Sequence, residues 1–292
     1  MPINLGATAI SNLKLGATQV DKVYLGTNLV WSSAPPPLRA IKFSSPVNQQ
    51  VQVLGSALGT ISPNFEYSTD GGTTWTTWAD VTSALSFGNG TDLYLRGSNT
   101  LLAQGTTNRT QFIFNGFNGS NYVDCTGNIM HLFDYTQDLT SFPSLSTSAG
   151  IRQMFSGVDC LRTAPDLPAT DLPGSAYYRL FYSCTALQNC PALPATTLSG
   201  SCYQDMFRSC SALQSISRLP ATTLANYCYT SMFRSCSNIK MSLTQDATYT
   251  NEYVFGTAPD SVNAANMFTA TGGSFVGAPT QTTYYTANTI IG

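Results

Sequence analysis

The fold of this chain is decided by the stretch Cys202-Tyr203-Gln204-Asp205-Met206-Phe207-Arg208-Ser209-Cys210-Ser211-Ala212-Leu213, whose pattern occurs four times. Its apolar pair and its last leucine recur every 26 residues, as Met154-Phe155, Leu180-Phe181, Met206-Phe207 and Met232-Phe233, then Leu161, Leu187, Leu213 and Ile239. A Leu-Pro-Ala-Thr motif keeps the same spacing at 167–170, 193–196 and 219–222. A fixed period in this range predicts a solenoid, in which each unit buries its apolar face against its neighbours.

Each unit is expected to contain one short helix and one short strand. The apolar residues at 202, 203, 206, 207 and 210 follow helical spacing. Residues 213–216 then read as a strand, and Leu219-Pro220 turns the chain toward the next unit. A helix and a strand within 26 residues are typical of leucine-rich repeats, whose units have about 20–29 residues.

The order aromatic, two residues, Cys, two residues, Leu and then Leu-Pro resembles the BspA-like (Treponema-type) leucine-rich repeat from about Ile129 to Ile239. The asparagine-ladder motif of the commoner leucine-rich consensus is missing. The resemblance implies a solenoid over 126–245. Val254-Phe255 and Met267-Phe268 echo the apolar pair less regularly, so we expect 246–292 to form an irregular cap.

A second repeat opens the chain, with Leu5-Gly6, Leu15-Gly16 and Leu25-Gly26 spaced ten residues apart. Ten residues fit a short strand, a glycine-assisted turn and a second strand. Three such units bury little surface alone, so residues 1–34 are expected to pair with copies of themselves or with another protein; a self-contained meander is the alternative. The side chains assigned to this assembly role are Leu5, Leu15, Leu25, Val30 and Trp31. Pro35-Pro36-Pro37 then forms a semi-rigid linker.

Residues 38–125 alternate apolar and polar residues in short runs separated by turn signals, which predicts a β-sandwich. Ser68 to Trp75 also resembles the Asp-box hairpin of sialidase-type propellers, where the motif is structural, and a single copy indicates a hairpin. The fold class expected for the whole chain is therefore mostly β with short helices: a β-repeat anchor, a sandwich and a solenoid.

Composition excludes two classes of partner. Of 292 residues only 10% are charged, against about 25% in ordinary globular proteins, and the formal net charge is -2. This leaves no dense basic face for nucleic acid and no polybasic patch for a membrane surface. Uninterrupted apolar runs stay below the roughly 18 residues of a membrane span, so we expect no membrane insertion.

The sequence predicts neither a catalytic site nor a cofactor or metal site. Cys184, Cys210 and Cys236, like Cys202 and Cys228, are 26 residues apart, so they are expected to form two ladders in the core, with disulfides between units only in an oxidising medium. The single histidine, His131, is expected at the surface or at the core edge. A pair of carboxylates for glycoside hydrolysis would have to come from aspartates such as Asp166, Asp171 and Asp205.

The N-terminal segment carries a second resemblance. Its first eight residues have no charged or apolar leader, so we expect no secretory signal. The decapeptides, with Val23-Tyr24-Leu25-Gly26 and Val30-Trp31, look like the N-terminal segments of phage head and tail fibre proteins, and the module order resembles fibres of crAss-like phages of Bacteroidota. The resemblance implies a virion-surface homo-oligomer, with a trimer favoured, made in the host cytoplasm. It would dock through its N-terminus on capsid, portal, neck or tail proteins.

Such a fibre would bind a host surface glycan or protein. The candidate receptor-binding residues are Trp75, Trp78, Tyr177, Tyr203 and Tyr229, with core packing as the alternative role of these rings. A bacterial BspA-like surface adhesin whose export signal is missing is the second hypothesis. A carbohydrate-active enzyme is the third.

Overall fold

The computed structural model divides the chain into two compact units, residues 1–38 and 39–292. It describes residues 38–104, 107–115, 121–144, 150–242, 251–252, 255–257 and 259–271, with backbone alone at 115, 241–242 and 251–252. Between residues 4 and 32 it describes the backbone of six strands. The proline linker predicted at 35–37 lies outside the described residues.

The first unit consists of three antiparallel hairpins: β1 (Asn4–Leu5) with β2 (Thr8–Ala9), β3 (Leu13–Leu15) with β4 (Thr18–Val20), and β5 (Lys22–Leu25) with β6 (Asn28–Ser32). Leu5 pairs with Thr8 and Leu15 with Thr18, which leaves two residues between each pair. The two paired strands expected in each ten-residue repeat are therefore confirmed. The five predicted assembly residues lie on these strands, but their side chains are outside the description.

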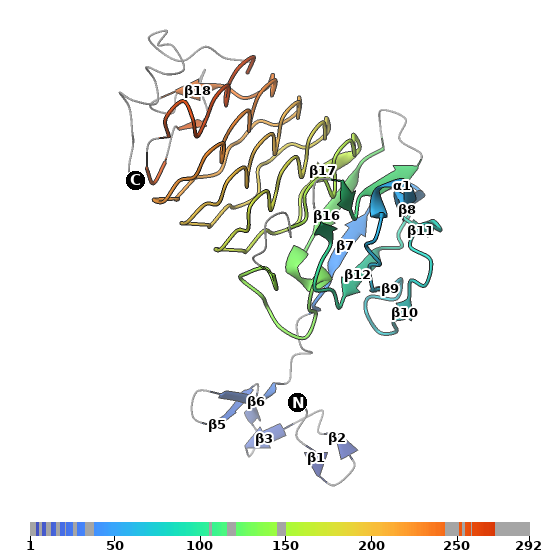
Figure 1. Cartoon of the computed structure of the whole chain (residues 1–292). Coiled ribbons are helices and arrows are strands. Elements are labelled where there is room, and N and C mark those ends of the chain that lie inside the picture. The colour runs from blue at the N-terminus through green and yellow to red at the C-terminus, as the bar shows by residue number, and fades with distance from the viewer. Residues whose placement is uncertain are drawn as a thin grey trace. The chain divides into compact units, whose positions relative to one another are not determined.

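The N-terminal part of the second unit contains two sheets whose strands are mostly antiparallel (Figure 1). The larger sheet has the order β10-β9-β12-β7-β16-β17, and the smaller one the order β11-β8-β15. Their bounds are β7 Ile41–Ser44, β8 Gln49–Val53, β9 Phe65–Ser68, β10 Thr76–Thr77, β11 Leu85–Phe87, β12 Leu93–Gly97, β15 Phe112–Asn115, β16 Val123–Thr126 and β17 Leu161–Thr163. The remaining elements are α1 Gly55–Leu58, β13 Ala103–Gln104, β14 Asn108–Arg109, the 3-10 helix η1 Ile129–Leu132, β18 Met241–Ser242 and β19 Asn251–Glu252.

The inner faces of the two sheets pack against each other. Ile41 and Phe43 of β7 alternate with outward residues and are fully buried. The Phe43 ring lies 5.7 Å from Phe112 and 5.3 Å from Phe114, both on the smaller sheet. With strands in both units and very few helical residues, the expected mostly-β class is confirmed for the described chain.

The predicted hairpin at Ser68–Trp75 is also confirmed, since β9 and β10 pair across it. Asp70 organises the turn by accepting hydrogen bonds from the backbone N–H groups of Thr73 and Thr74 and from the Thr74 hydroxyl, at 3.0, 2.9 and 2.6 Å. These bonds stabilise the carboxylate and lower the pKa of Asp70 below its usual range.

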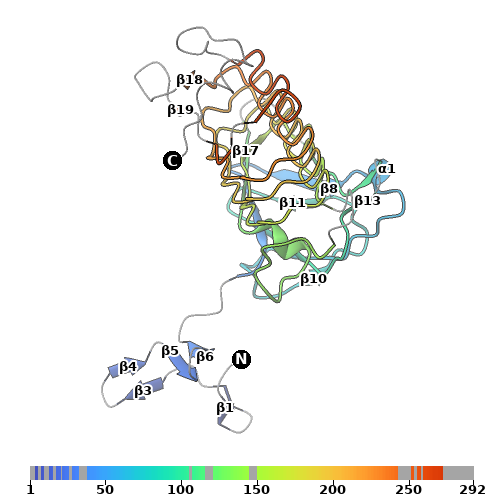
Figure 2. The same cartoon turned by 60° about the vertical axis from the view of Figure 1, so that its left-hand side comes forward.

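Beyond the sheets, four nine-residue segments spaced 26 residues apart lie side by side: 150–158, 176–184, 202–210 and 228–236 (Figures 1 and 2). We call them arcs. Every second N–H of an arc donates to the next arc, as in Tyr177 to Cys202, Arg179 to Gln204 and Phe181 to Met206 at 2.9 to 3.0 Å. The intervening N–H groups bond within the arc, three residues back. All these donors are thereby satisfied without a helix.

The short helix predicted at 202–210 is therefore wrong. An α-helix bonds each N–H to the fourth preceding carbonyl and keeps φ negative throughout. The arc uses three-residue bonds instead, and Ser201, Asp205 and Ser209 have φ values of 58°, 54° and 65°. This left-handed residue at every fourth position bends the chain into turns, and side chains face in and out in pairs, as Ala176 and Tyr177 inward and Tyr178 and Arg179 outward.

The strand predicted at 213–216 is likewise not formed: no strand is assigned to that described stretch, although the Gln214 N–H donates to the Gln188 carbonyl at 2.9 Å. Its equivalent two repeats earlier, β17, does form a strand, because it pairs in parallel with β16 at the edge of the larger sheet. Further along each 26-residue repeat, single parallel bridges join Asp171 to Thr197 and Thr197 to Thr223.

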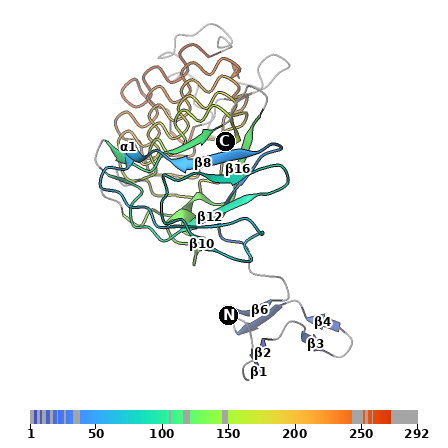
Figure 3. The same cartoon turned by 90° about the vertical axis from the view of Figure 1, so that its right-hand side faces the viewer.

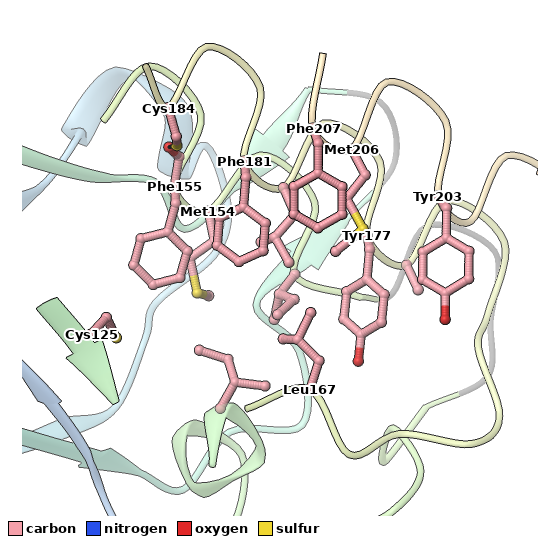
Figure 4. Close-up of a cluster of buried hydrophobic side chains, with 14 of the residues drawn as sticks. Cys125, Met154, Phe155, Leu167, Tyr177, Phe181, Cys184, Tyr203, Met206 and Phe207 are labelled. Atoms are coloured by element: carbon pink, nitrogen blue, oxygen red, sulfur yellow. Dashed lines mark hydrogen bonds between the residues drawn. The ribbon is translucent and has the colours of Figure 1, made fainter. Parts of the chain in front are cut away.

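Two columns of aromatic rings fill the interior of the arcs (Figure 4). The phenylalanine column has centroid spacings of 5.5 to 5.6 Å between near-parallel rings and contains Phe155, Phe181, Phe207, Phe233 and Phe268. It continues into the sheets, because Phe155 lies 5.6 Å from Phe112 and 6.4 Å from Phe43. Figure 3 shows the strands of both sheets gathered at one end of the coils. Sheets and arcs thus share one core.

Candidate binding surface on the arcs

The three tyrosines predicted as an exposed sugar-binding ladder lie inside the core. Tyr177, Tyr203 and Tyr229 do stack on one another, with centroids 5.8 and 6.0 Å apart. Each, however, is at most 1% exposed, so the prediction of a surface ladder is wrong. The reason is the paired facing of arc residues: these tyrosines occupy inward positions, beside an alanine or a cysteine.

The two predicted tryptophans are also engaged within the protein. Trp78 is 4% exposed, packs on Phe65, and donates from Nε1 to the Ser83 carbonyl at 3.1 Å. Trp75 is half-buried, and the guanidinium of Arg96 lies 3.9 Å above its ring. Of the predicted receptor-binding residues, Trp75 alone keeps a partly exposed ring on the described surface.

The cysteine ladders are present as predicted. The thiols of Cys184, Cys210 and Cys236 each donate to the carbonyl of a phenylalanine in the preceding arc, at 3.0 Å. All eight cysteines are free, and burial raises the pKa of Cys160 and of Cys236 to about 12. Such thiols pack as small apolar groups and are poor nucleophiles.

The remaining candidates are scattered. Asp166 and Asp171 are exposed and form backbone bridges, whereas Asp205 is buried in an arc. His131 is buried with its Nε2 2.8 Å from Asp138 Oδ1. The described residues contain no cluster of three metal-ligating side chains, and no helix among them is long and apolar enough to span a bilayer.

The outward positions of the arcs carry a different set of residues, which we call the arginine–tyrosine strip: Tyr178, Arg179, Tyr182, Asp205, Arg208 and Arg234. They belong to three neighbouring arcs, held in register by bonds such as Ser183 N–H to the Arg208 carbonyl and Ser209 N–H to the Arg234 carbonyl, both 2.8 Å. Tyr182, Arg208 and Arg234 therefore occupy equivalent places on successive arcs, about 4.8 Å apart.

Asp205 organises the middle of the strip. Its two carboxylate oxygens lie 3.3 Å from Arg179 Nε and 3.2 Å from Arg208 Nη1. The carboxylate is only 5% exposed, whereas the two arginine side chains remain 36% and 30% exposed. One buried acid thus fixes two guanidinium groups that still face solvent.

The tyrosines complete the surface. The guanidinium of Arg179 lies 5.0 Å from the Tyr178 ring and 5.2 Å from the Tyr182 ring, and Arg208 lies 5.7 Å from Tyr182. Cation–π contacts of this kind hold long side chains in place. Three arginines and one aspartate leave a formal charge of +2 on the strip. The arrangement can hold an anion beside flat aromatic faces.

Sequence reasoning missed this strip, although a signal was present. The run Ala176-Tyr177-Tyr178-Arg179-Leu180-Phe181-Tyr182-Ser183 alternates two inward with two outward residues. Reading it with a period of four would have placed Tyr178, Arg179 and Tyr182 outside and Tyr177 inside.

Comparison with known proteins identifies no relative: no family model matches the chain, and neither curated proteins nor solved structures give a match. The function therefore has to be argued from the molecule itself.

Proposed function

We propose that this protein is a non-enzymatic fibre subunit on the surface of a bacteriophage virion. In this proposal the first unit docks on other virion proteins and assembles the subunit into a homo-oligomer, with a trimer favoured. The second unit, a β-sandwich followed by a solenoid of BspA-like leucine-rich repeats, is displayed to bind the surface of the host cell.

The observation that carries the proposal is the division of the chain after residue 38. One unit is small and consists of three two-stranded hairpins, and the other is large and has a continuous core. Isolated hairpins are marginally stable in water, so a unit built only of them gains stability by pairing with further strands. Copies of the same unit, or a virion protein, supply such strands.

The second unit has properties that suit display. Its backbone bonds run from arc to arc, and each arc presents outward side chains at fixed places. Repeats of this kind create extended surfaces on which neighbouring units offer similar groups to a partner. A host surface glycan or protein is the partner that we assign to it.

The test compares the solution mass of the intact chain with that of a chain lacking residues 1–37, by light scattering. The proposal expects an oligomer that falls to monomer on truncation. Monomers in both samples would remove the assembly role of the first unit and contradict the homo-oligomeric fibre.

A bacterial surface adhesin is the second candidate, because the large unit would serve an adhesin equally well. Antibodies against residues 39–292 distinguish the two. Labelling of purified phage particles supports the fibre, whereas labelling of uninfected bacterial cells supports the adhesin.

A further inference from the structure

We propose that the arginine–tyrosine strip binds an acidic polysaccharide, through carboxylate groups held by Arg179, Arg208 and Arg234. The inference rests on the proposed function, since it names the class of receptor that the displayed surface takes.

Charge is the first argument. The whole chain has a net charge of -2, yet the strip has a surplus of two positive charges. Arg208 and Arg234 occupy equivalent places on adjacent arcs, where like charges repel each other. Asp205 offsets part of this repulsion at Arg208, but no ion pair reaches Arg234 among the described residues. A bound carboxylate relieves the repulsion that remains.

Preorganisation is the second argument. Arg179 and Arg208 are already held by the buried Asp205 and by tyrosine rings, so their side chains lose little freedom when a ligand binds. The guanidinium fork matches a carboxylate with two hydrogen bonds, and the side chains of Arg179 and Arg208 remain 36% and 30% exposed.

The surroundings favour a sugar over a nucleic acid. Tyr178 and Tyr182 offer flat faces beside the cations, and Ser183, Ser209 and Ser235 are partly exposed at the next outward position of three arcs. Hydroxyl groups of this kind hydrogen-bond the hydroxyls of a sugar ring. A phosphate backbone would need more cations, because affinity for nucleic acid rises with each phosphate that is neutralised.

The experiment measures binding of the full chain to polygalacturonate, a uronic-acid polymer, by biolayer interferometry. The double variant Arg208→Gln/Arg234→Gln removes two cations of the strip, and Arg39→Gln/Lys42→Gln removes two cations elsewhere as the matched control. The control side chains are a close match, because Arg39 and Lys42 are 36% and 34% exposed and Arg208 is 30% exposed. Dextran, polyglutamate and a single-stranded oligodeoxynucleotide serve as comparison polymers.

We expect saturable binding to polygalacturonate that weakens about tenfold in the strip variant and less than twofold in the control, since each exposed ion pair contributes a few-fold. Dextran and polyglutamate should bind at least tenfold more weakly. No binding to polygalacturonate, equal loss in both variants, or equal binding to polyglutamate or the oligonucleotide would overturn the proposal.

The outcome is separable from that of the proposed function. If the intact chain attaches to host cells but does not bind polygalacturonate, the fibre stands and the acidic-glycan assignment fails. If the chain attaches to no cell and labels no virion, the fibre fails whatever the polymer data show.

Discussion

At the residue scale, the tyrosine column contains hydroxyl groups that have no role in the core. The hydroxyls of Tyr177 and Tyr203 are buried and have no hydrogen-bond partner (Figure 4). A buried hydroxyl without a partner loses its bonds to water and regains none. The packing contacts of the column are therefore made by the rings. At its two ends, Phe142 contacts Tyr177 and Phe255 contacts Tyr229.

This predicts that Tyr203→Phe raises the free energy of unfolding by about 1 kcal/mol. Urea denaturation followed by circular dichroism measures the change, with Tyr182→Phe, a half-buried outward tyrosine, as the control expected near zero. A loss of stability in Tyr203→Phe would show that the hydroxyl has a partner in solution.

Buried thiols predict a sensitivity to alkaline pH. Burial raises the pKa of Cys160 and Cys236 to about 12, from about 9 in the unfolded chain. The folded state therefore retains protons that the unfolded state loses above about pH 9, and stability falls as pH rises from 9 toward 12 by about 1.4 kcal/mol per pH unit and thiol.

We accordingly expect the free energy of unfolding to fall between about pH 8.5 and 10.5 under reducing conditions, and to fall less steeply in Cys160→Ala/Cys236→Ala. Cys190→Ala removes one half-buried thiol outside the two ladders, and its slope of unfolding free energy against pH shows the effect of losing a single thiol. Identical slopes in the wild-type and double-variant proteins would contradict the assignment.

At the element scale, the sequence predicted the 26-residue spacing, the hairpins and the cysteine ladders, but it misassigned the arc. Inward residues at 202, 203, 206, 207 and 210 repeat every four residues, and this period is close to the 3.6 of a helix. Residue type did not separate an arc from a helix, because the left-handed positions are held by Ser201, Asp205 and Ser209 and not by glycine, the usual signal of positive φ. Bonds to neighbouring arcs compensate for that strain, and these are invisible in a single unit.

The same four-residue period explains why the candidate site was only half predictable. Tyr177 and Tyr178 are adjacent, and both have an aromatic ring, yet one is buried and the other faces solvent. The predicted binding ladder was based on the 26-residue recurrence of tyrosine. This recurrence marks the buried column, because packing keeps the residue type the same from repeat to repeat. Outward residues vary between arcs, so Arg179 and Asp205 share a place without sharing a charge.

Register between arcs yields a prediction of its own. Deleting residues 186–211 removes one full period and joins Thr185 to Ala212, which takes the place of Ala186. We expect a folded protein of lower stability, because each repeat contacts mainly its neighbours. Circular dichroism and urea denaturation test this.

The control deletion, 186–209, is two residues shorter. A two-residue offset exchanges inward with outward pairs in the joined segment, so apolar residues would face solvent and this variant should fail to fold cooperatively. Equal stability of the two deletion variants would contradict the register argument.

At the scale of the whole molecule, the large unit is one cooperative body if its core is continuous. Phe155 connects the two halves, since its ring contacts Phe112 of the sheets and Phe181 of the next arc. The parallel pairing of β16 with β17 joins the same parts through the backbone. Neither contact would be expected if sheets and arcs were separate domains on a linker.

The last prediction is that the sheets and arcs of the full chain unfold together. In a Trp31→Phe variant the remaining tryptophans, Trp75 and Trp78, report on the sheets, while the reactivity of the Cys210 and Cys236 thiols reports on the arcs. Both probes should give one urea midpoint, as a cooperative two-state transition requires. Phe155→Ala should lower both midpoints equally, since removing a buried phenylalanine costs about 3–5 kcal/mol. Separate midpoints, or a shift of one probe alone, would mean that the arcs fold independently of the sheets and that the shared aromatic column contributes little to the stability of either.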